Sequence, residues 1–332
     1  MSNIKNILLN KITCKSIWFM RQAGRYLPEF QKIRQENKDF IKLCLNSELS
    51  AEITLQPIKR YDLDSAIIFS DILMVPFALG QNIKFIKDSG PKLSKFDLNL
   101  FLRSNEKKFS EKLEPVYKAI DITRRKLNKN KSLISFIGAP WTLLIYMLDL
   151  KNSKNEIDGH KVNETKFDTL IDVLIKYLCI HIKNQVNAGA DVIQIFDSWA
   201  GLVPLNKIED YCYFPNKKIV EFCNKERIPN ICFPKGIKKR YEFFNKIVKP
   251  DGINLDPDIN PKWARDNLKD VVLQGGLDPN VLLKSDGEII ETATKYIETF
   301  KDIPYIFNLG HGLLPETDPD KVGKLVKFYR SF

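Results

Sequence analysis

The sequence has 332 residues, 44% of them hydrophobic. A chain of this length buries about three quarters of its unfolded surface, which predicts one large domain. It contains no run of about 18 apolar residues and no signal-peptide core, so a membrane-spanning protein is not expected. The net charge of +11 is compatible with nucleic acid, a membrane surface or an acidic substrate as partner, and equally with lysines scattered over solvated faces.

Cysteine usage and charge clustering narrow these classes. The six cysteines form no CxxC pair and no regular framework, which favours buried thiols in a reducing, cytoplasmic setting. The densest basic cluster, Arg124 to Lys131, lies at the end of a helical pattern, where cations suit the helix dipole. No aromatic residues alternate with its charges, so nucleic-acid binding is not expected.

Eight short apolar runs of the kind that form buried strands recur along the chain. They are Ile17–Met20, Ser65–Phe69, Leu133–Phe136, Val192–Phe196, Asn230–Phe233, Gly252–Leu255, Val271–Leu273 and Tyr305–Phe307. Segments of helical period, such as Phe167 to Val186 and Gly287 to Phe300, separate them. This alternation predicts a closed parallel (β/α)8 TIM barrel, with residues 1–332 as a single domain. A doubly wound open sheet is the alternative, but no GxGxxG turn follows the first run.

Three segments depart from a plain strand–helix unit. Gly80 to Phe101 contains two short stretches in which apolar and polar residues alternate, and this pattern predicts a small hairpin that flanks the site. Leu150 to Asn163 is polar and predicts a loop. Asp318 to Phe332 predicts a final helix.

Polar residues and glycines follow every apolar run. In chain order they are Arg21 and Arg25, Ser70-Asp71, Gly138-Ala139-Pro140-Trp141, Asp197-Ser198, Lys235-Gly236, Asp256, Gly275-Gly276 and Gly310-His311-Gly312. In a parallel barrel all these positions meet at the carboxyl end, where barrel enzymes build their active sites. The pattern therefore predicts a site at that end.

Arg21 and Arg25 are the first candidates for ligand binding. Arginine is scarce here, with 11 arginines against 41 lysines. Its planar guanidinium binds carboxylate or phosphate through two parallel hydrogen bonds, which lysine cannot do. Two such groups after a buried strand predict an anion site. Structural arginines that bridge surface carboxylates are the alternative.

Several stretches together resemble the uroporphyrinogen decarboxylase family. The longest match is the unbroken segment from Trp18 to Glu29. Shorter similar segments are Phe69–Leu73, Gly138–Met147, Gln194–Gly201 and Phe307–Gly312. The resemblance implies a barrel enzyme that removes the four acetate carboxylates of uroporphyrinogen. It also implies a homodimer whose active-site faces lie toward each other.

The resemblance also implies roles for individual residues. Asp71, Arg21 and Tyr146 would be catalytic, with Asp71 meeting the pyrrole nitrogens. The substrate-binding residues would be Arg21, Gln22, Ala23, Gly24, Arg25, Asp71, Tyr146, Phe196, Ser198 and His311. No cofactor is expected, because the sequence has no zinc-ligand spacing and no cofactor fingerprint.

Each of these residues also has a structural interpretation. Asp71 and Ser198 follow strands, where such residues often cap the next helix. Tyr146 lies in a helical pattern, where most tyrosines pack in a core. His311 could simply cap its loop. Ser198 lacks the histidine and acid companions of a serine hydrolase, so it is not read as a nucleophile.

Two other functions remain as alternatives. A corrinoid-type methyltransferase of the same barrel superfamily would need a thiolate-rich zinc site with a His-x-Cys pattern, and none of the three histidines is followed by such a cysteine. A tetrapyrrole-binding protein without catalysis is the other. Turnover of the reduced porphyrinogen distinguishes it from an enzyme.

Overall fold

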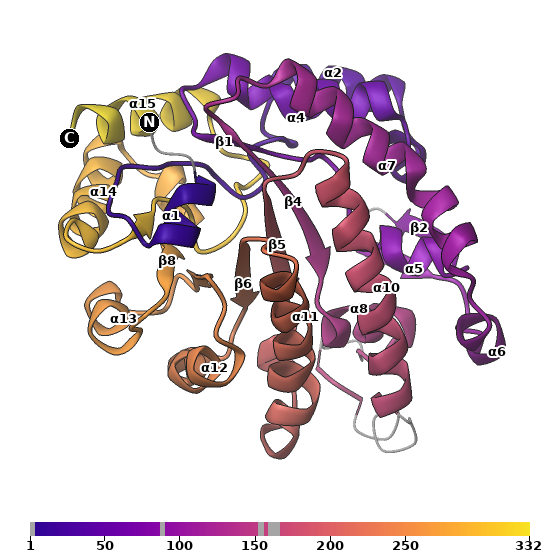
Figure 1. Ribbon diagram of the computed structural model, residues 1–332. Helices are drawn as coiled ribbons and strands as arrows, with labels where there is room; N and C mark the ends of the chain where they lie inside the picture. Colours follow the sequence, from indigo (N-terminus) through magenta and orange to yellow (C-terminus); the bar gives the residue numbers. More distant parts are fainter. Residues whose placement is uncertain (1–3, 87–89, 152–155, 159–166) are drawn as a thin grey trace.

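The computed structural model describes residues 4–86, 90–151, 156–158 and 167–332. Its main sheet has seven strands in the order β1-β4-β5-β6-β7-β8-β9, and every neighbouring pair is parallel. The strands are β1 (Ser65–Ile67), β4 (Ser132–Gly138), β5 (Val192–Asp197), β6 (Asn230–Pro234), β7 (Gly252–Leu255), β8 (Val272–Gly275) and β9 (Tyr305–Ile306). The predicted alternation of parallel strands and helices is confirmed (Figure 1).

The first predicted strand, Ile17–Met20, is the main difference from the expected barrel. It forms only an isolated parallel bridge between Ile17 and Phe307. On its other side the Asp64 N–H donates to the Ile17 carbonyl at 2.9 Å, so the segment still joins β9 to β1 and closes the ring. The ladder stops early because the chain turns at once: the Gln22 N–H donates to the Phe19 carbonyl, and Arg21 has a φ of 60°.

Helices lie outside the strands (Figure 1). They are α1 (Ile4–Asn10), α2 (Pro28–Glu36), α3 (Phe40–Cys44), α4 (Ser47–Arg60), α5 (Met74–Ala78), α6 (Leu98–Leu102), α7 (Glu106–Lys126), α8 (Pro140–Met147), α10 (Phe167–Asn187), α11 (Phe214–Lys225), α12 (Tyr241–Val248), α13 (Pro261–Asn267), α14 (Asp286–Phe300) and α15 (Pro319–Ser331). The predicted helices near 167, 287 and 318 are thereby confirmed. Within the described part of the chain, none of these helices is both long and apolar enough to cross a membrane.

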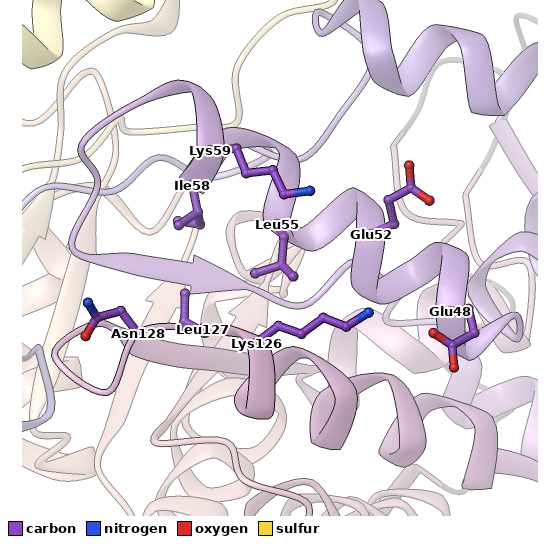
Figure 2. Close-up of a pocket in the computed structure, with 8 residues that line it drawn as sticks. All are labelled: Glu48, Glu52, Leu55, Ile58, Lys59, Lys126, Leu127 and Asn128. Atoms are coloured by element: carbon purple, nitrogen blue, oxygen red, sulfur yellow. The ribbon is translucent and has the colours of Figure 1, made fainter.

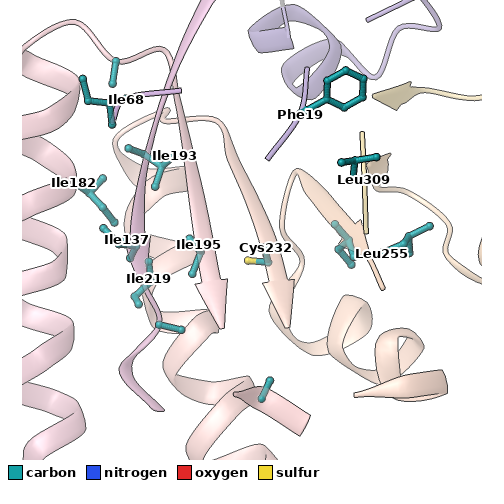
Figure 3. Close-up of a cluster of buried hydrophobic side chains, with 14 of the residues drawn as sticks. Phe19, Ile68, Ile137, Ile182, Ile193, Ile195, Ile219, Cys232, Leu255 and Leu309 are labelled. Atoms are coloured by element: carbon teal, nitrogen blue, oxygen red, sulfur yellow. The ribbon is translucent and has the colours of Figure 1, made fainter. Parts of the chain in front are cut away.

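Alternation along each strand produces two apolar layers, because successive side chains point to opposite faces. Ile193 and Ile195 belong to the outer layer, which packs against helices that carry Ile182 and Ile219 (Figure 3). Val192 points inward with the other members of a separate buried cluster. Each fully buried side chain of this kind contributes roughly 1.5–3 kcal/mol.

Helix α1 closes the amino end of the barrel. Its buried residues Ile4, Ile7 and Leu8 belong to the same inner cluster as the inward-facing strand residues. A Cβ on Gly252 at the start of β7 would lie 2.9 Å from a Leu8 methyl carbon, so the helix packs closely against the strands. The carboxyl end lies at the opposite ends of these strands.

The segment after β1 carries the predicted hairpin. Its strands β2 (Ile83–Ile86) and β3 (Gly90–Leu93) are antiparallel, which confirms the excursion from the barrel. The predicted loop at Leu150 to Asn163 lies mostly outside the described residues. Lys151 and Ile157, which are described, form an isolated antiparallel bridge.

Candidate active site

Arg21 interacts electrostatically with several charged or polar groups at the carboxyl end of the barrel. Asp71 and Tyr146 raise its pKa, but burial and the nearby Arg25 act more strongly and lower it. In turn, the charge of Arg21 acts on His311 and Lys235. Groups that follow different strands of the barrel therefore converge on this guanidinium, while Arg21 itself remains accessible to solvent.

Gly312 allows the Arg21 side chain to reach this position. A Cβ at residue 312 would lie 2.2 Å from the Arg21 Cδ and 2.5 Å from its Cγ. The two segments are also joined by a 2.9 Å hydrogen bond from the Leu313 N–H to the Met20 carbonyl. Any side chain larger than hydrogen at 312 therefore forces Arg21 to move.

The loop from Gln22 to Gly24 is held from beneath. Gln22 is fully buried; its Oε1 accepts from the Phe19 N–H at 3.0 Å, and its Nε2 donates to the Ser65 carbonyl at 2.9 Å. Both ends of this side chain are therefore engaged with backbone, and substrate binding by Gln22 stays a prediction. Ala23 is half-buried against the core, and the Gly24 carbonyl accepts from the Leu27 N–H.

The two carboxylate oxygens of Asp71 differ in their hydrogen bonding. Its Oδ1 accepts a 2.8 Å hydrogen bond from the Leu73 N–H, which is a local cap of the turn before α5. Its Oδ2 accepts no hydrogen bond from any residue that the structure describes. Burial raises the pKa of Asp71 to about 6, although the Leu73 N–H and Arg21 favour the carboxylate. One carboxylate oxygen is thus left for a ligand.

Tyr146 lies in α8, close to Trp199. Their rings meet edge to face at 6.2 Å, and Tyr146 is half-buried. Burial raises the pKa of Tyr146, so its phenol keeps its proton at neutral pH. The charges of Asp71 and Arg21 act on this phenol, so the three groups belong to the same end of the barrel, where the phenol can donate a hydrogen bond.

The residues at the end of β5 divide between structure and site. Asp197 is buried and accepts hydrogen bonds from Thr142, Asn216 and Cys212, so it is a structural carboxylate. The half-buried Ser198 next to it makes no hydrogen bond with its hydroxyl among the described residues. Its predicted alternative role as a helix cap is therefore not seen.

Aromatic and histidine groups complete this end of the barrel. Phe196 is half-buried and packs against Phe136 with ring centroids 5.6 Å apart. Burial, with Lys235 and Arg21 nearby, lowers the pKa of His311 to about 4. His311 is therefore neutral at pH 7, so one of its ring nitrogens donates a hydrogen bond and the other accepts one.

Arg21 and Arg25 differ from other arginines of the protein in their ion pairing. Arg60, Arg124 and Arg330 each form an ion pair with a carboxylate elsewhere in the protein. Over the residues that the structure describes, Arg21 and Arg25 form none. The alternative that these two arginines bridge surface carboxylates is therefore wrong, and they remain available for an anionic ligand.

A surface groove of about 550 Å³ lies away from these residues, between α4 and the end of α7 (Figure 2). Its lining includes two glutamates and two lysines, at Glu48, Glu52, Lys59 and Lys126. Lys59 and Lys126 extend along it toward the glutamates in Figure 2. None of the predicted site residues lines the groove, so it is a separate surface feature.

Comparison with known proteins decides the family. Residues 10–332 match the family described as Uroporphyrinogen decarboxylase (URO-D). The chain is 45% identical over 325 residues to the uroporphyrinogen decarboxylase of Orientia tsutsugamushi (strain Ikeda), covering 95% of this chain and 94% of that protein. It is 40% identical to that of Rickettsia felis, covering 100% and 97%. The chain belongs to the uroporphyrinogen decarboxylase family.

A solved structure supports the fold of this uroporphyrinogen decarboxylase family member. A methyltransferase from Methanosarcina mazei superposes with a TM-score of 0.72 at 16% identity, covering 99% of this chain and 97% of that one. At this identity the similarity concerns the fold alone. Among the described residues, no group of three or more His, Cys, Asp or Glu side chains could hold a metal ion.

The predicted site of this family member omitted one residue that the structure brings to the carboxyl end. Lys235 follows β6 and is half-buried; the charge of Arg21 acts on Lys235, and the charge of Lys235 acts on His311. The sequence did carry a signal, because Lys235 directly follows an apolar run like the other rim residues. It lies outside the matched segments, so no role was assigned to it.

Proposed function

We propose that the protein converts uroporphyrinogen III to coproporphyrinogen III in porphyrin and haem biosynthesis, as a carboxy-lyase. It would remove four acetate carboxylates as CO2 and leave methyl groups. One observation carries this assignment beyond family membership: the carboxylate oxygen of Asp71 that no described residue engages lies near Arg21 and Tyr146. At this end of the barrel, Arg21, Arg25 and Lys235 form no ion pair with any residue that the structure describes. This arrangement suits an anionic substrate that becomes cationic at its centre.

The chemistry requires a place for the electrons of the bond that breaks. In the proposed reaction, a proton adds to a ring carbon of the pyrrole and makes a cation. The bond to the carboxylate then breaks, CO2 leaves, and the electron pair neutralises the ring. A proton adds to the exocyclic carbon and another leaves the ring carbon, so each acetate consumes one proton net and becomes a methyl group.

The chain's own side chains would supply electrostatics and orientation. Asp71 would face the pyrrole N–H groups and stabilise the positive ring, a preorganised charge of the kind that contributes most in buried sites. Tyr146 would donate a hydrogen bond near the reacting acetate. Arg21, Arg25, Ser198 and His311 would hold carboxylates, and Phe196 would offer its ring face to the macrocycle.

Loop residues before α2 would act mainly through the backbone. Gln22 is engaged with Phe19 and Ser65, so we assign it a positioning role for the arginines on either side. Gly24 leaves room beside the Arg21 carbonyl, from which a Cβ would be only 2.9 Å away. Ala23 would present a small side chain next to the ligand.

A turnover assay tests the proposed function. The purified protein is incubated with uroporphyrinogen III without oxygen, the products are oxidised, and porphyrins are separated by their number of carboxylates. We expect stepwise conversion from eight carboxylates to four. Binding without conversion would instead support a tetrapyrrole-binding protein. Dialysis against a chelator should leave the rate unchanged, and a loss that added metal restores would contradict a cofactor-free reaction.

We also propose that the protein is a homodimer whose carboxyl ends face each other. Large apolar side chains stand exposed just after β5 and β6: Leu205 is 66% exposed, Phe243 62% and Phe214 43%. These residues follow the carboxyl ends of their strands, on the face that would be covered. Exposed apolar side chains gathered on one face are typical of an interface with another chain.

Sedimentation velocity tests this interface. Phe243→Asp should shift the protein toward the monomer, because the interface would then bury an unpaired carboxylate. Ile290→Asp is the matched control, since Ile290 is also exposed, at 42%, but lies on α14 at the outside of the barrel. A wild-type monomer at micromolar concentration, or an unchanged dimer after Phe243→Asp, would contradict the proposed face.

We further infer a cytoplasmic location and a single domain. Four of the six cysteines, Cys44, Cys212, Cys223 and Cys232, are buried thiols outside any disulfide, which fits a reducing compartment. The barrel strands and the helices around them share one large apolar cluster, which supports one folding unit.

A further inference from the structure

We propose that Lys235 is a further substrate-binding residue, which holds a carboxylate that the reaction leaves in place. This inference rests on the proposed function, in which the substrate carries propionate groups that are retained beside acetate groups that are lost. It adds a charged anchor on the side of the barrel where the neighbouring strand β5 contributes only the uncharged Ser198 and Phe196 to the predicted site.

The backbone around Lys235 is held rigidly. Its N–H lies within hydrogen-bond distance of the Asp197 and Phe233 carbonyls, at 3.1 and 3.0 Å, and its carbonyl accepts from the Gly201 N–H at 2.9 Å. The next residue, Gly236, adopts a φ of 84°, which favours glycine. A Cβ on Gly201 would lie 2.8 Å from the Gly236 carbonyl oxygen, so the two loops are in close contact.

The nearest carboxylate serves this loop and does not pair with the lysine. Asp256 is buried, and its Oδ2 accepts a 2.7 Å hydrogen bond from the Gly236 N–H and a 2.9 Å hydrogen bond from the Tyr241 hydroxyl. Asp256 thus fixes the turn that carries Lys235. Across the described ranges, the Lys235 ammonium forms neither an ion pair nor a hydrogen bond.

The surroundings of the ammonium call for an anion. Burial lowers the pKa of Lys235; Asp256 opposes this effect and Arg21 adds to it. A half-buried cation that also feels the charge of a second cation, and that pairs with no carboxylate of the described residues, is electrostatically unfavourable until a negative charge binds to it. His311, neutral at pH 7, lies close enough to contribute a hydrogen bond to the same anion.

The position of Lys235 in the ring suits a large substrate with carboxylates around its rim. Strand β6 lies four places from the Ile17 segment in either direction around the barrel, so Lys235 and Arg21 enter the carboxyl end from opposite walls. The arginines would hold one side of the macrocycle, and Lys235 would hold another. A single small anion would not need anchors on opposite walls.

The fixed ammonium of Lys235 is better suited to bind a carboxylate that the reaction retains than one that leaves as CO2. A cation that binds the reacting carboxylate stabilises it before CO2 leaves and not afterwards, which slows the step. A cation that binds a retained carboxylate stabilises the substrate and the transition state alike. Such uniform binding lowers KM without changing kcat.

Steady-state kinetics with the intact protein test the proposal. Lys235→Met should raise KM for uroporphyrinogen about 10- to 100-fold, the effect expected from the loss of one charge-assisted hydrogen bond, and leave kcat nearly unchanged. Lys235→Arg should restore KM to within about 3-fold, since it keeps the charge. Lys129→Met is the matched control: Lys129 is exposed in the loop before β4, at the amino end, and its loss should change nothing.

The outcomes separate this inference from the proposed function. If the wild-type protein does not convert uroporphyrinogen, the proposed function fails. The anion anchor can still be tested in that case: the wild type should bind coproporphyrin, and Lys235→Met should weaken this binding. If the wild type converts it and Lys235→Met leaves KM unchanged, the inference is wrong. A lower kcat at unchanged KM would assign Lys235 to the reacting group and also overturn it. Should Lys235→Met lose its circular-dichroism melting transition, Lys235→Gln takes its place under the same criteria.

Discussion

Replacing Asp71 with asparagine should abolish nearly all turnover and leave the protein folded. Asparagine keeps the shape of the side chain but removes the negative charge that would face the pyrrole N–H groups. Loss of one preorganised group at the site of developing charge costs on the order of 10²–10³ in kcat. The measurement is kcat under anaerobic conditions, together with a thermal melt of the same sample.

The fold should survive because the structural part of Asp71 is preserved. The Leu73 N–H donates to Oδ1, and the Oδ1 of asparagine accepts in the same way. Burial raises the pKa of Asp71 to about 6, above its ordinary value, so the fold binds this proton more tightly than the unfolded chain does. Ionisation at neutral pH therefore disfavours the fold, and the asparagine variant should melt at the same temperature or higher.

Asp197→Asn is the matched control for this variant. Asp197 is also a buried aspartate at the carboxyl end, and burial raises the pKa of Asp197 to about 6 as well. Its oxygens are occupied by Thr142, Asn216 and Cys212. We expect Asp197→Asn to lower the melting temperature and to retain most of the activity of the folded fraction. Near-native turnover by Asp71→Asn would remove Asp71 from its proposed role.

The same carboxylate should set the acidic limb of the pH profile. As the pH falls through about 6, Asp71 takes up a proton and loses the charge that the reaction uses, so kcat/KM should decrease. The pKa of His311 is about 4, so this histidine stays neutral over that range and does not produce the limb. Arg21 lowers the pKa of Asp71, and its removal should move the limb to higher pH.

Period and spacing were enough to predict the barrel. Short apolar runs separated by helical segments correspond to β1 and β4 to β9, and polar residues after the runs meet at one end as expected. The Ile17 run was predicted to be a full strand because its residues are apolar, and it forms only one bridge. Its apolar residues do face the two layers, but the turn at Phe19 to Gln22 ends the pairing after one bridge.

The end of the barrel where the candidate residues lie was predictable from the sequence, but their contacts were not. A motif indicates which residues gather, but it does not say where each hydrogen bond goes. Gln22 was predicted to bind substrate, and its side chain binds backbone below the loop. Asp71 was interpreted as either a cap or a ligand-binding group; one of its oxygens caps the turn, and the other has no hydrogen bond from a described residue. Such choices depend on groups that come from distant parts of the chain.

Lys235 and α1 illustrate a second limit. The role proposed for Lys235 depends on its having no ion-pair partner among the described residues, and only the packed structure can establish this. Helix α1 was not predicted, although its apolar residues fill the amino end of the barrel. A seven-residue amphipathic segment carries too little periodic signal, and tertiary packing decides its structure.

Replacing Arg21 should have the second-largest effect on catalysis. Arg21→Lys keeps the charge but loses the planar guanidinium, which binds a carboxylate through two hydrogen bonds. The ammonium of lysine cannot reproduce that geometry. Arg21→Met removes the charge as well and should lower kcat/KM by about 100-fold or more, the cost of removing one partner of a desolvated charge pair. We expect Arg21→Lys to lie between Arg21→Met and the wild type.

A substitution that never touches the substrate tests whether the position of this guanidinium matters. The Cβ of Gly312→Ala would overlap the Arg21 stem, 2.2 Å from Cδ and 2.5 Å from Cγ, so Arg21 must shift while its charge is kept. A displacement of about 1 Å at a reacting centre can cost about 10²-fold in rate. We therefore expect Gly312→Ala to approach Arg21→Met in kcat/KM.

Gly287→Ala is the matched control, because a Cβ there meets nothing within 4 Å and lies in the first turn of α14. It should leave the kinetics unchanged and stabilise the helix slightly, by roughly 1 kcal/mol or less. If Gly312→Ala and Gly287→Ala have the same kcat/KM as the wild type, a shifted Arg21 still works, and precise orientation of this fork is not required. If only Gly312→Ala loses activity, and its melting temperature is unchanged, catalysis requires the Arg21 guanidinium in the position that it takes beside Gly312.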